Sequence, residues 1–170
     1  MYVRLEEAAD AAGIRAVHAA AFARPDLRPA EADLVDALRR AGDLIPPLCF
    51  VALDHDGVIG HVACSTGTIG SRVLPALGPV GVAPSRQGQG IGHALLHAVL
   101  GAADALGEPA VLLLGDPGFY GRFGFESAAR HGVTPVDPAW GPAFQLRRLG
   151  HWDPAITGTF RYAPAFETVA

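Results

Sequence analysis

The chain has 170 residues, of which half are hydrophobic and 18% are charged, and its formal net charge is −4. This profile is typical of a single globular domain and lacks the basic stripe that a nucleic-acid binder needs. No apolar run approaches the roughly 20 residues of a membrane span, and the acidic start MYVRLEEAAD lacks the apolar stretch of a signal peptide. We therefore expect a cytoplasmic protein without a membrane segment.

All thirteen basic residues are arginine, which excludes mechanisms that need a Schiff-base lysine or a Walker A lysine. The amino-terminal part is predicted to contain a short strand at residues 2–5, an alanine-rich helix at 6–22 and a second helix at 31–41. Gly42 stands where a glycine is expected to end that second helix.

Two strands are predicted at residues 49–53 and 58–65, and the Asp-Gly pair between them supplies the positive φ angles of a tight hairpin turn. A looser stretch is expected at residues 66–75, before a central strand at 77–82. The three strands should form an antiparallel meander.

A glycine-rich turn and a long helix over residues 91–106 follow the central strand. The start of a helix exposes unpaired backbone N–H groups and the positive end of the helix dipole. Glycines at 88, 90 and 92 would let an anion approach those groups, and Arg86 adds a charge that can fork onto phosphate. The pattern predicts a pyrophosphate-binding turn, with a plain strand-to-helix turn as the alternative.

The apolar run at residues 110–114 is typical of a strand buried on both faces, and we expect it to run parallel to the central strand through a right-handed crossover. A short helix at 117–123 and strands near 125–128 and 143–149 should follow. Residues 150–170 are expected to form a tail that packs on the domain or on the partner subunit of a homodimer.

Two motifs in this order resemble those of the GNAT N-acetyltransferase superfamily. The pattern Gln87-x-x-Gly90-x-Gly92, after a Val-x-Val strand, resembles the acetyl-CoA motif of that family, and LGDPGFYGRFGF resembles its next strand and helix. The likeness spans residues 1–149, the expected acetyltransferase domain. The segments GHVACS and RYAPAF make it closest to the YhbS-like branch of predicted N-acetyltransferases.

The resemblance implies a mixed α/β sheet, mostly antiparallel, with helices on both faces and two central parallel strands that splay apart. It also implies that acetyl-CoA, the acyl donor, lies between those strands, with its diphosphate on the turn and its pantetheine arm along the central strand. The expected acetyl-CoA contacts are Val80, Gly81, Val82, Arg86, Gln87, Gly88, Gln89, Gly90, Ile91, Gly92 and His93.

The resemblance implies transfer of an acetyl group to a primary amine of a small molecule or peptide, by direct attack in a ternary complex. A backbone N–H of the central strand would polarise the thioester carbonyl. Tyr120 is the candidate acid, because a phenol with a pKa near 10 can protonate the leaving thiolate. The alternative for Tyr120 is a packing role at the start of the short helix.

Three residues are candidates for the general base. Glu31 begins the second helix, His61 lies on the third strand, and Asp116 follows the fifth strand. Each also has a structural interpretation: a first-turn charge, a core histidine and a helix N-cap, respectively. A bound water that relays the proton is a further alternative.

Other chemistry is disfavoured by the pattern. Cys49 and Cys64 lie among apolar residues and are expected to be buried free thiols. His93 and His97 have the spacing of zinc ligands but not the glutamate of a metalloprotease, so no metal site is expected. His93 also occupies the position where a dinucleotide-binding motif needs glycine or alanine. The remaining rival is a non-catalytic sensor protein that binds acyl-CoA.

Overall fold

The computed structural model describes residues 1–27 and 29–168. In chain order the strands and longer helices are β1 (Tyr2–Leu5), α1 (Ala11–Ala21), α2 (Ala30–Ala41), β2 (Phe50–Asp54), β3 (Gly57–Ile69), β4 (Arg72–Val82), α3 (Ile91–Ala105), β5 (Ala110–Leu114), α4 (Pro117–Tyr120), β6 (Glu126–Ser127), β7 (Val133–Pro135), β8 (Phe144–Arg148) and β9 (Gly158–Arg161). Short 3₁₀ turns, among them η1 (Ala8–Asp10) and η7 (Pro164–Thr168), connect them.

In the described part of the chain, nine strands form one mixed sheet with the order β1-β2-β3-β4-β5-β8-β6, and β9 pairs with both β3 and β7. The β4–β5 and β7–β9 pairs are parallel, and the other pairs are antiparallel. The predicted meander of β2, β3 and β4 and the predicted β4–α3–β5 crossover are both confirmed.

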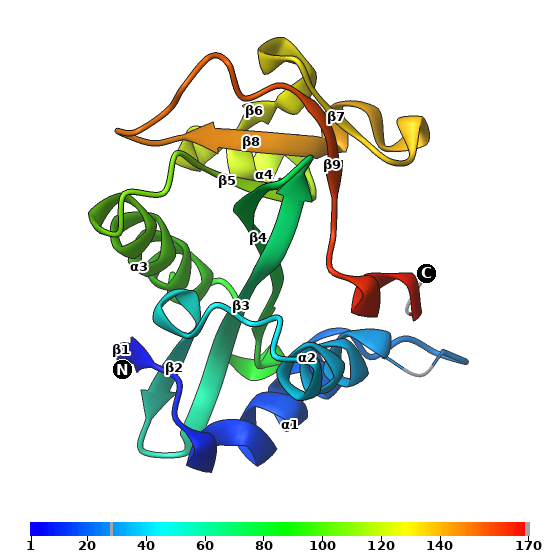
Figure 1. Cartoon of the computed structure of the whole chain (residues 1–170). Helices are drawn as coiled ribbons and strands as arrows, with labels where there is room; N and C mark the ends of the chain where they lie inside the picture. Colours follow the sequence, from blue (N-terminus) through cyan, green and yellow to red (C-terminus); the bar gives the residue numbers. More distant parts are fainter. Residues whose placement is uncertain (28, 169–170) are drawn as a thin grey trace.

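The two central parallel strands splay apart. Their pairing is confined to Ala76 of β4 and Leu112 of β5, whereas β4 stays paired with β3 as far as Val82. A register shift in the β3–β4 ladder places one extra residue in β4 between Leu77 and Val80. The last residues of β4 therefore keep β3 on one side and present an open edge on the other, in the gap visible between β4 and β5 (Figure 1).

Helices cover both faces of the long β3–β4 ladder (Figure 1). On one face, Leu95, Leu96 and Val99 of α3 pack into a core cluster with residues of β3. On the other face, Ile14 of α1 and Val35 of α2 pack in a second cluster. Each helix buries one apolar face against the sheet, which is the usual driving force for such layers. The predicted fold class is confirmed.

The C-terminal segment returns to the middle of the molecule. β9 pairs with the end of β3, and η7 then packs beside α2, where Ala163 and Phe166 contact a cluster that contains Leu34 and Leu38. In Figure 1 this segment descends along the sheet and ends next to α2. Residues 150–168 therefore pack on the same molecule, while a domain boundary at residue 149 stays a prediction.

Two expectations for local structure were wrong. Residues 66–75 are not loose: they belong to β3 and β4, which turn between Ile69 and Arg72, and the pairing of β9 with β3 supports this extension. The expected helix over 6–22 instead begins with η1, where Glu7 and Asp10 cap each other reciprocally, and α1 starts only at residue 11. In the described ranges, no helix is long and apolar enough to cross a membrane.

Candidate active site

A cleft of about 880 Å³ opens where β4 leaves β5. It extends from the first turn of α3 to α4 on one side and to the C-terminal end of α1 on the other. Its lining residues are Ala21, Phe22, Val80, Val82, Arg86, Gln87, Gly88, Gly90, Ile91, Gly92, His93, Phe119, Tyr120 and Arg122. The cleft thus brings together most of the residues predicted for acetyl-CoA, together with Tyr120.

The glycine turn leaves the start of α3 open to a ligand. Gly88 and Gly90 have φ angles of 75° and 81°, a backbone region that strongly favours glycine. A Cβ at either position would meet nothing within 4 Å, and a Cβ at Gly92 would meet only a methyl group of Val82 at 4.0 Å. The unpaired N–H groups at the start of this 15-residue helix therefore face open space of the kind that an anion fills.

The two glutamines of the motif brace the turn. The side-chain amide of Gln87 donates to the Val82 carbonyl at 3.2 Å, and that of Gln89 donates to the Ser85 carbonyl at 3.3 Å. The first bond ties the turn to the end of β4, and the second lies within the turn itself. Gln87 lines the cleft and Gln89 does not, so the role of Gln89 that the geometry supports is to hold the turn in place.

Two arginines line the cleft, and they differ in their partners. Arg86 Nη2 lies 2.7 Å from carboxylate oxygens of both Asp54 and Asp56 on the β2–β3 hairpin, so its charge is already balanced. Arg122 is exposed, and no carboxylate of the described residues pairs with it. Arg122 is therefore the better-placed free cation of the cleft, although the sequence analysis assigned that function to Arg86.

The end of β4 presents different groups to the two faces of the sheet. Val80 and Val82 line the cleft and pack against the α3 core, whereas Gly81 faces α1. A Cβ at Gly81 would lie 2.8 Å from Nδ1 of His18. The open edge of this strand supplies unpaired backbone groups beside the cleft, as the sequence analysis expected for the central strand.

Tyr120 ends α4 at the other wall of the cleft. Asp116 caps that short helix by accepting a hydrogen bond from the Gly118 amide at 2.9 Å, which is the structural role anticipated for Asp116. The Tyr120 ring makes edge contacts with Phe119 and Phe125 at centroid distances of 4.9 and 5.9 Å. These contacts hold the ring in the cleft wall.

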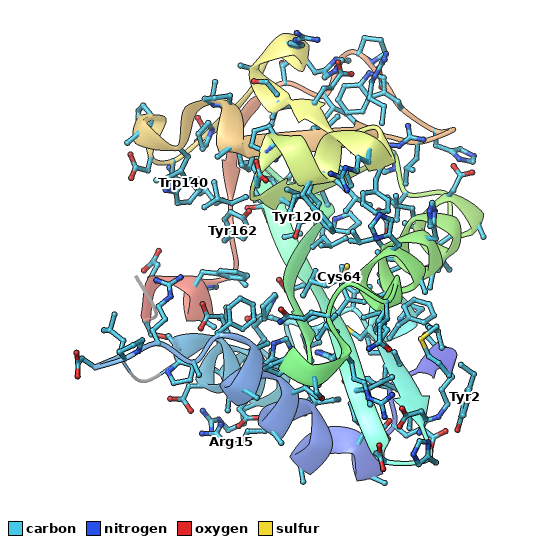
Figure 2. All side chains as sticks on the ribbon, turned by 180° about the vertical axis from the view of Figure 1, so that it is seen from behind. Tyr2, Arg15, Cys64, Tyr120, Trp140 and Tyr162 are labelled. Carbon is cyan, nitrogen blue, oxygen red and sulfur yellow. The ribbon has the colours of Figure 1, made fainter. Side chains whose placement is uncertain are left out.

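Burial raises the pKa of Tyr120 above its ordinary value, so the phenol stays protonated at neutral pH. No described residue makes a hydrogen bond to its hydroxyl, which leaves the proton available to a ligand. Tyr162, from the segment after β9, lies close enough to interact electrostatically with Tyr120, and the two appear close together in Figure 2. The C-terminal segment thus passes near Tyr120.

The candidate bases lie outside the residues that line the cleft. Glu31 is half-buried in the first turn of α2. His61 is fully buried in β3, where its Nε2 lies 2.7 Å from Glu6 and its Nδ1 lies 2.8 Å from His18 Nε2. His61 therefore cannot take a proton directly from a substrate in the cleft, and any such transfer would need an intermediary.

The histidines on α3 and the cysteines behave as structural groups. His93 and His97 pack against Phe123 at centroid distances of 5.0 and 5.3 Å. Cys49 and Cys64 are free and buried, as predicted, and burial raises the pKa of the Cys49 thiol to about 12. A thiol with such a pKa is a poor nucleophile at neutral pH.

In the described residues, one group of acidic and histidine side chains has the spacing of metal ligands, namely 54–56 on the β2–β3 hairpin. Its two carboxylates already pair with Arg86. The two negative charges of the hairpin are therefore balanced by Arg86.

Four lining residues were missed by the sequence analysis: Ala21, Phe22, Phe119 and Arg122. Phe119 and Arg122 lie inside the FY-x-x-FGF segment, which could have indicated them. Ala21 and Phe22 end α1, and no local pattern marks them, because the contact of α1 with the cleft depends on the tertiary packing.

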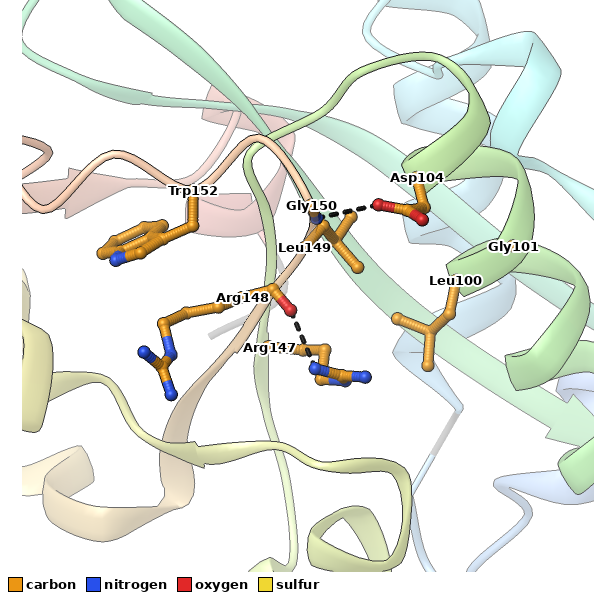
Figure 3. A pocket seen from close by; sticks show the side chains of 8 residues that line it. All are labelled: Leu100, Gly101, Asp104, Arg147, Arg148, Leu149, Gly150 and Trp152. Atoms are coloured by element: carbon orange, nitrogen blue, oxygen red, sulfur yellow. Dashed lines mark hydrogen bonds between the residues drawn. The ribbon is translucent and has the colours of Figure 1, made fainter.

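A second hollow of about 570 Å³ lies at the far end of α3 (Figure 3). It is lined by residues of α3 and of the segment from 147 to 152, and none of the predicted site residues lines it. Two of its polar side chains bond within the chain: Asp104 accepts from the Gly150 amide and Arg147 donates from Nη1 to the Arg148 carbonyl, both at 2.8 Å. The first cleft, which contains the predicted site residues, is therefore the candidate active site.

Comparison with known proteins identifies the class. A family model described as an acetyltransferase (GNAT) domain matches residues 46–127. The uncharacterized N-acetyltransferase YhbS of Escherichia coli strain K12 is 39% identical over 161 residues, which cover 93% of this chain and 92% of the relative. The chain therefore belongs to the GNAT family of N-acetyltransferases and is an acyltransferase by class, as the motifs predicted.

Two solved structures extend the likeness to the whole fold. YhbS of Escherichia coli in complex with CoA matches with a TM-score of 0.86 and 36% identity, over 98% of this chain and 91% of the other. A GNAT family acetyltransferase from Brucella melitensis in complex with acetyl-CoA matches with a TM-score of 0.79 and 37% identity, over 97% of each chain.

Proposed function

We propose that this protein binds acetyl-CoA in the cleft and transfers the acetyl group to a primary amine of a small molecule or peptide, by direct attack in a ternary complex. The observation that carries the proposal is the continuity of the open β4 edge with the glycine turn of α3, in one cleft that also contains Tyr120. The relatives crystallised with CoA and with acetyl-CoA support the choice of donor.

The parts of the cleft match the parts of acetyl-CoA. The start of α3 and Arg122 would take the diphosphate, since backbone N–H groups and a guanidinium both favour phosphate. The free edge of β4 near Val80 would pair with the amide groups of the pantetheine arm. A backbone N–H there would hydrogen-bond the thioester oxygen, where negative charge develops as the amine attacks.

The two substrates would bind on opposite sides of the point where β4 and β5 separate. The glycine turn lies on the α3 side, while Ala21 and Phe22 line the cleft on the α1 side. The amine would enter from the α1 side and meet the thioester between the splayed strands. Tyr120 would then give its proton to the departing thiolate, because a phenol whose pKa is raised by burial is protonated at neutral pH.

The test is to measure acetyl-CoA binding by calorimetry and CoA release with a panel of primary amines. Spermidine, 2-phenylethylamine and glycylglycine represent three acceptor classes. We expect binding and amine-dependent CoA release with at least one class, together with an acetylated product by mass spectrometry. Binding without transfer to any amine would contradict the proposal and would favour the acyl-CoA-binding sensor instead.

A further inference from the structure

The part of the cleft next to α1 is apolar. Ala21, the last residue of α1, and Phe22, which follows it, line the cleft on this side. Val80 of β4 and Tyr120 of α4 line the same cleft. Apart from the Tyr120 hydroxyl, these four side chains consist of carbon and hydrogen. A molecule that enters from the α1 side therefore meets a surface that favours apolar groups.

The permanently charged residues that line the cleft belong to other elements and have one sign. Arg86 ends η3 (Pro84–Arg86) before the glycine turn, and Arg122 lies in η4 (Gly121–Phe123) after α4. Among the described residues that line the cleft, none is an aspartate or a glutamate. An acceptor with a second positive charge would therefore find no carboxylate in the cleft wall, and Arg122 would repel it.

Phe22 is held in the cleft wall by a ring stacked against it. The His18 ring, one turn earlier in the chain, is 0% exposed and stacks on Phe22 at a centroid distance of 5.9 Å and an interplanar angle of 14°. His18 Nε2 lies 2.8 Å from His61 Nδ1, and His61 Nε2 lies 2.7 Å from Glu6 Oε2. These hydrogen bonds fix the orientation of the ring on which Phe22 rests.

The glycine at position 81 makes this stack possible. A Cβ there would lie 2.8 Å from Nδ1 and 3.1 Å from Cε1 of His18. Any side chain at Gly81 would therefore displace the His18 ring, and with it the support of Phe22. Because Phe22 is ordered before a ligand arrives, a ligand that packs on it loses little free energy in fixing the ring.

We propose that the acceptor is a primary monoamine with an apolar body, and that Phe22 is the specificity-determining residue on which this body packs. The proposal rests on the proposed acetyl transfer and names its substrate class. An aromatic or aliphatic body gains from contact with the Phe22 ring. A second charge on the acceptor would be removed from water without a partner, which is costly.

The apolar wall also acts on the charge of the amine itself. Burial disfavours the charged form of an amine, so an ammonium in this part of the cleft should lose its proton to bulk water more readily. The neutral amine that results is the form that attacks the thioester. Burial acts in the same sense on Tyr120, whose pKa it raises. A monoamine benefits from this effect, whereas a diamine would keep a second ammonium without a partner.

The first test measures binding and needs no turnover. Calorimetry on the CoA-loaded protein compares two pairs whose members differ in charge: hexylamine with hexamethylenediamine, and 2-phenylethylamine with phenylalanine. We expect the monoamine of each pair to bind at least about tenfold more tightly, or about 1.4 kcal/mol. A smaller preference, tighter binding of the more highly charged member, or no binding of either monoamine would overturn the proposal.

The second test assigns the preference to Phe22. Phe22→Ala should weaken 2-phenylethylamine binding to the CoA-loaded protein about tenfold, while CoA affinity stays within a few-fold. Phe22→Asp should favour hexamethylenediamine over hexylamine, because the new carboxylate can pair with the second ammonium. Val17→Ala, a buried change on the same helix outside the cleft, is the control for lost packing. Parent-like selectivity in both Phe22 variants, or the same change in Val17→Ala, would overturn the proposal.

The proposed function and the monoamine class fail separately. A parent protein that binds the monoamines selectively but transfers no acetyl group would refute the proposed function and support the monoamine site. A protein that acetylates spermidine or glycylglycine faster than 2-phenylethylamine would support the proposed function and refute the monoamine class.

Discussion

The ring of Tyr120 packs directly against the backbone of Gly115: a Cβ at Gly115 would lie 2.8 Å from Cδ2 of the tyrosine and closer still to Cε2. Gly115 follows β5, the strand that separates from β4. The absence of a side chain at position 115 therefore lets the phenol lie close to the end of the splayed strand. This close approach, together with the contacts with Phe119 and Phe125, sets the position of the candidate acid.

Gly115→Ala should displace the Tyr120 ring and lower kcat by about tenfold or more, since small misplacements of a reacting group are costly. Acetyl-CoA affinity should change little, because the phosphate turn lies on another element. Gly121→Ala is the matched control: it lies next to Tyr120, has a φ of −55°, and a Cβ there would meet nothing within 4 Å. Steady-state kinetics and calorimetry on both variants check this, and equal losses in the two would contradict the spacing role of Gly115.

Tyr120→Phe keeps the ring and its contacts with Phe119 and Phe125 but removes the proton. Turnover should fall by about 10²-fold, which is a typical loss for a general acid, while acetyl-CoA affinity stays within a few-fold. The loss should shrink above the pKa of the CoA thiol, where the thiolate leaves without a proton. A pH–rate profile of parent and variant measures this. Unchanged turnover at every pH would leave Tyr120 with a packing role only.

Gly92→Glu tests the phosphate seat without the strain of a positive φ angle, since Gly92 lies within the regular first turn of α3. The new carboxylate should repel the diphosphate and weaken acetyl-CoA binding by at least about tenfold, or about 1.4 kcal/mol. Gly92→Ala controls for the added Cβ. Gly101→Glu adds the same charge near the far end of α3, where a Cβ meets nothing within 4 Å. Calorimetry should find near-parent affinity in both controls; unchanged affinity in a folded Gly92→Glu protein would exclude this seat.

Arg122→Gln removes the cleft cation that has no carboxylate partner in the described residues. Acetyl-CoA should bind several-fold more weakly, and the difference from the parent should narrow as salt is added, because exposed charges are screened. Arg161→Gln, an exposed arginine on β9 outside the cleft, is the control. Calorimetry at two ionic strengths measures the effect. An equal loss in both variants would indicate a net-charge effect and not a phosphate contact.

The sequence predicted the parts of the fold that depend on local patterns. The apolar run at 110–114 forms β5 with those bounds, because a strand buried on both faces is apolar throughout. The apolar residues spaced from residue 91 lie on α3, because a helix buried on one face has a helical apolar period. The extent of β3 was not predictable in this way. Its outer end pairs with β9, which lies about ninety residues further along the chain, and no local pattern records that partner.

The same limit applies to the candidate site. The glycine turn and Tyr120 lie in contiguous motifs and were predicted, whereas Ala21 and Phe22 come to the cleft, and His18 comes to lie against Gly81, only through the packing of α1 on β4. The alanine-rich sequence around His18 gives no sign that its ring meets His61, forty-three residues away. Arg86 was expected to offer its charge to phosphate. The sequence could not show that two aspartates of the hairpin, about thirty residues earlier, lie beside it.

The buried histidines predict a dependence of stability on pH. Burial lowers the pKa of His18 to about 3 and also lowers that of His61, despite the opposing hydrogen bond from Glu6. The unfolded chain binds protons at the ordinary histidine pKa of about 6.5, so below that pH the unfolded state holds more protons than the folded state. The contribution of the two neutral histidines to the free energy of unfolding should therefore be fully present above about pH 6.5. It should be lost as the pH falls toward their folded-state pKa values.

Urea unfolding between about pH 6 and pH 5 measures this effect above the range in which most carboxylates titrate. Each buried neutral histidine should add a slope that approaches about 1.4 kcal/mol per pH unit. His18→Gln should remove one such contribution and flatten the curve, although it lowers stability at neutral pH. His151→Gln, which changes an exposed histidine, should leave the slope as in the parent. A His18→Gln protein with the parent slope would mean that His18 takes up its proton without unfolding, contrary to a ring kept neutral by burial.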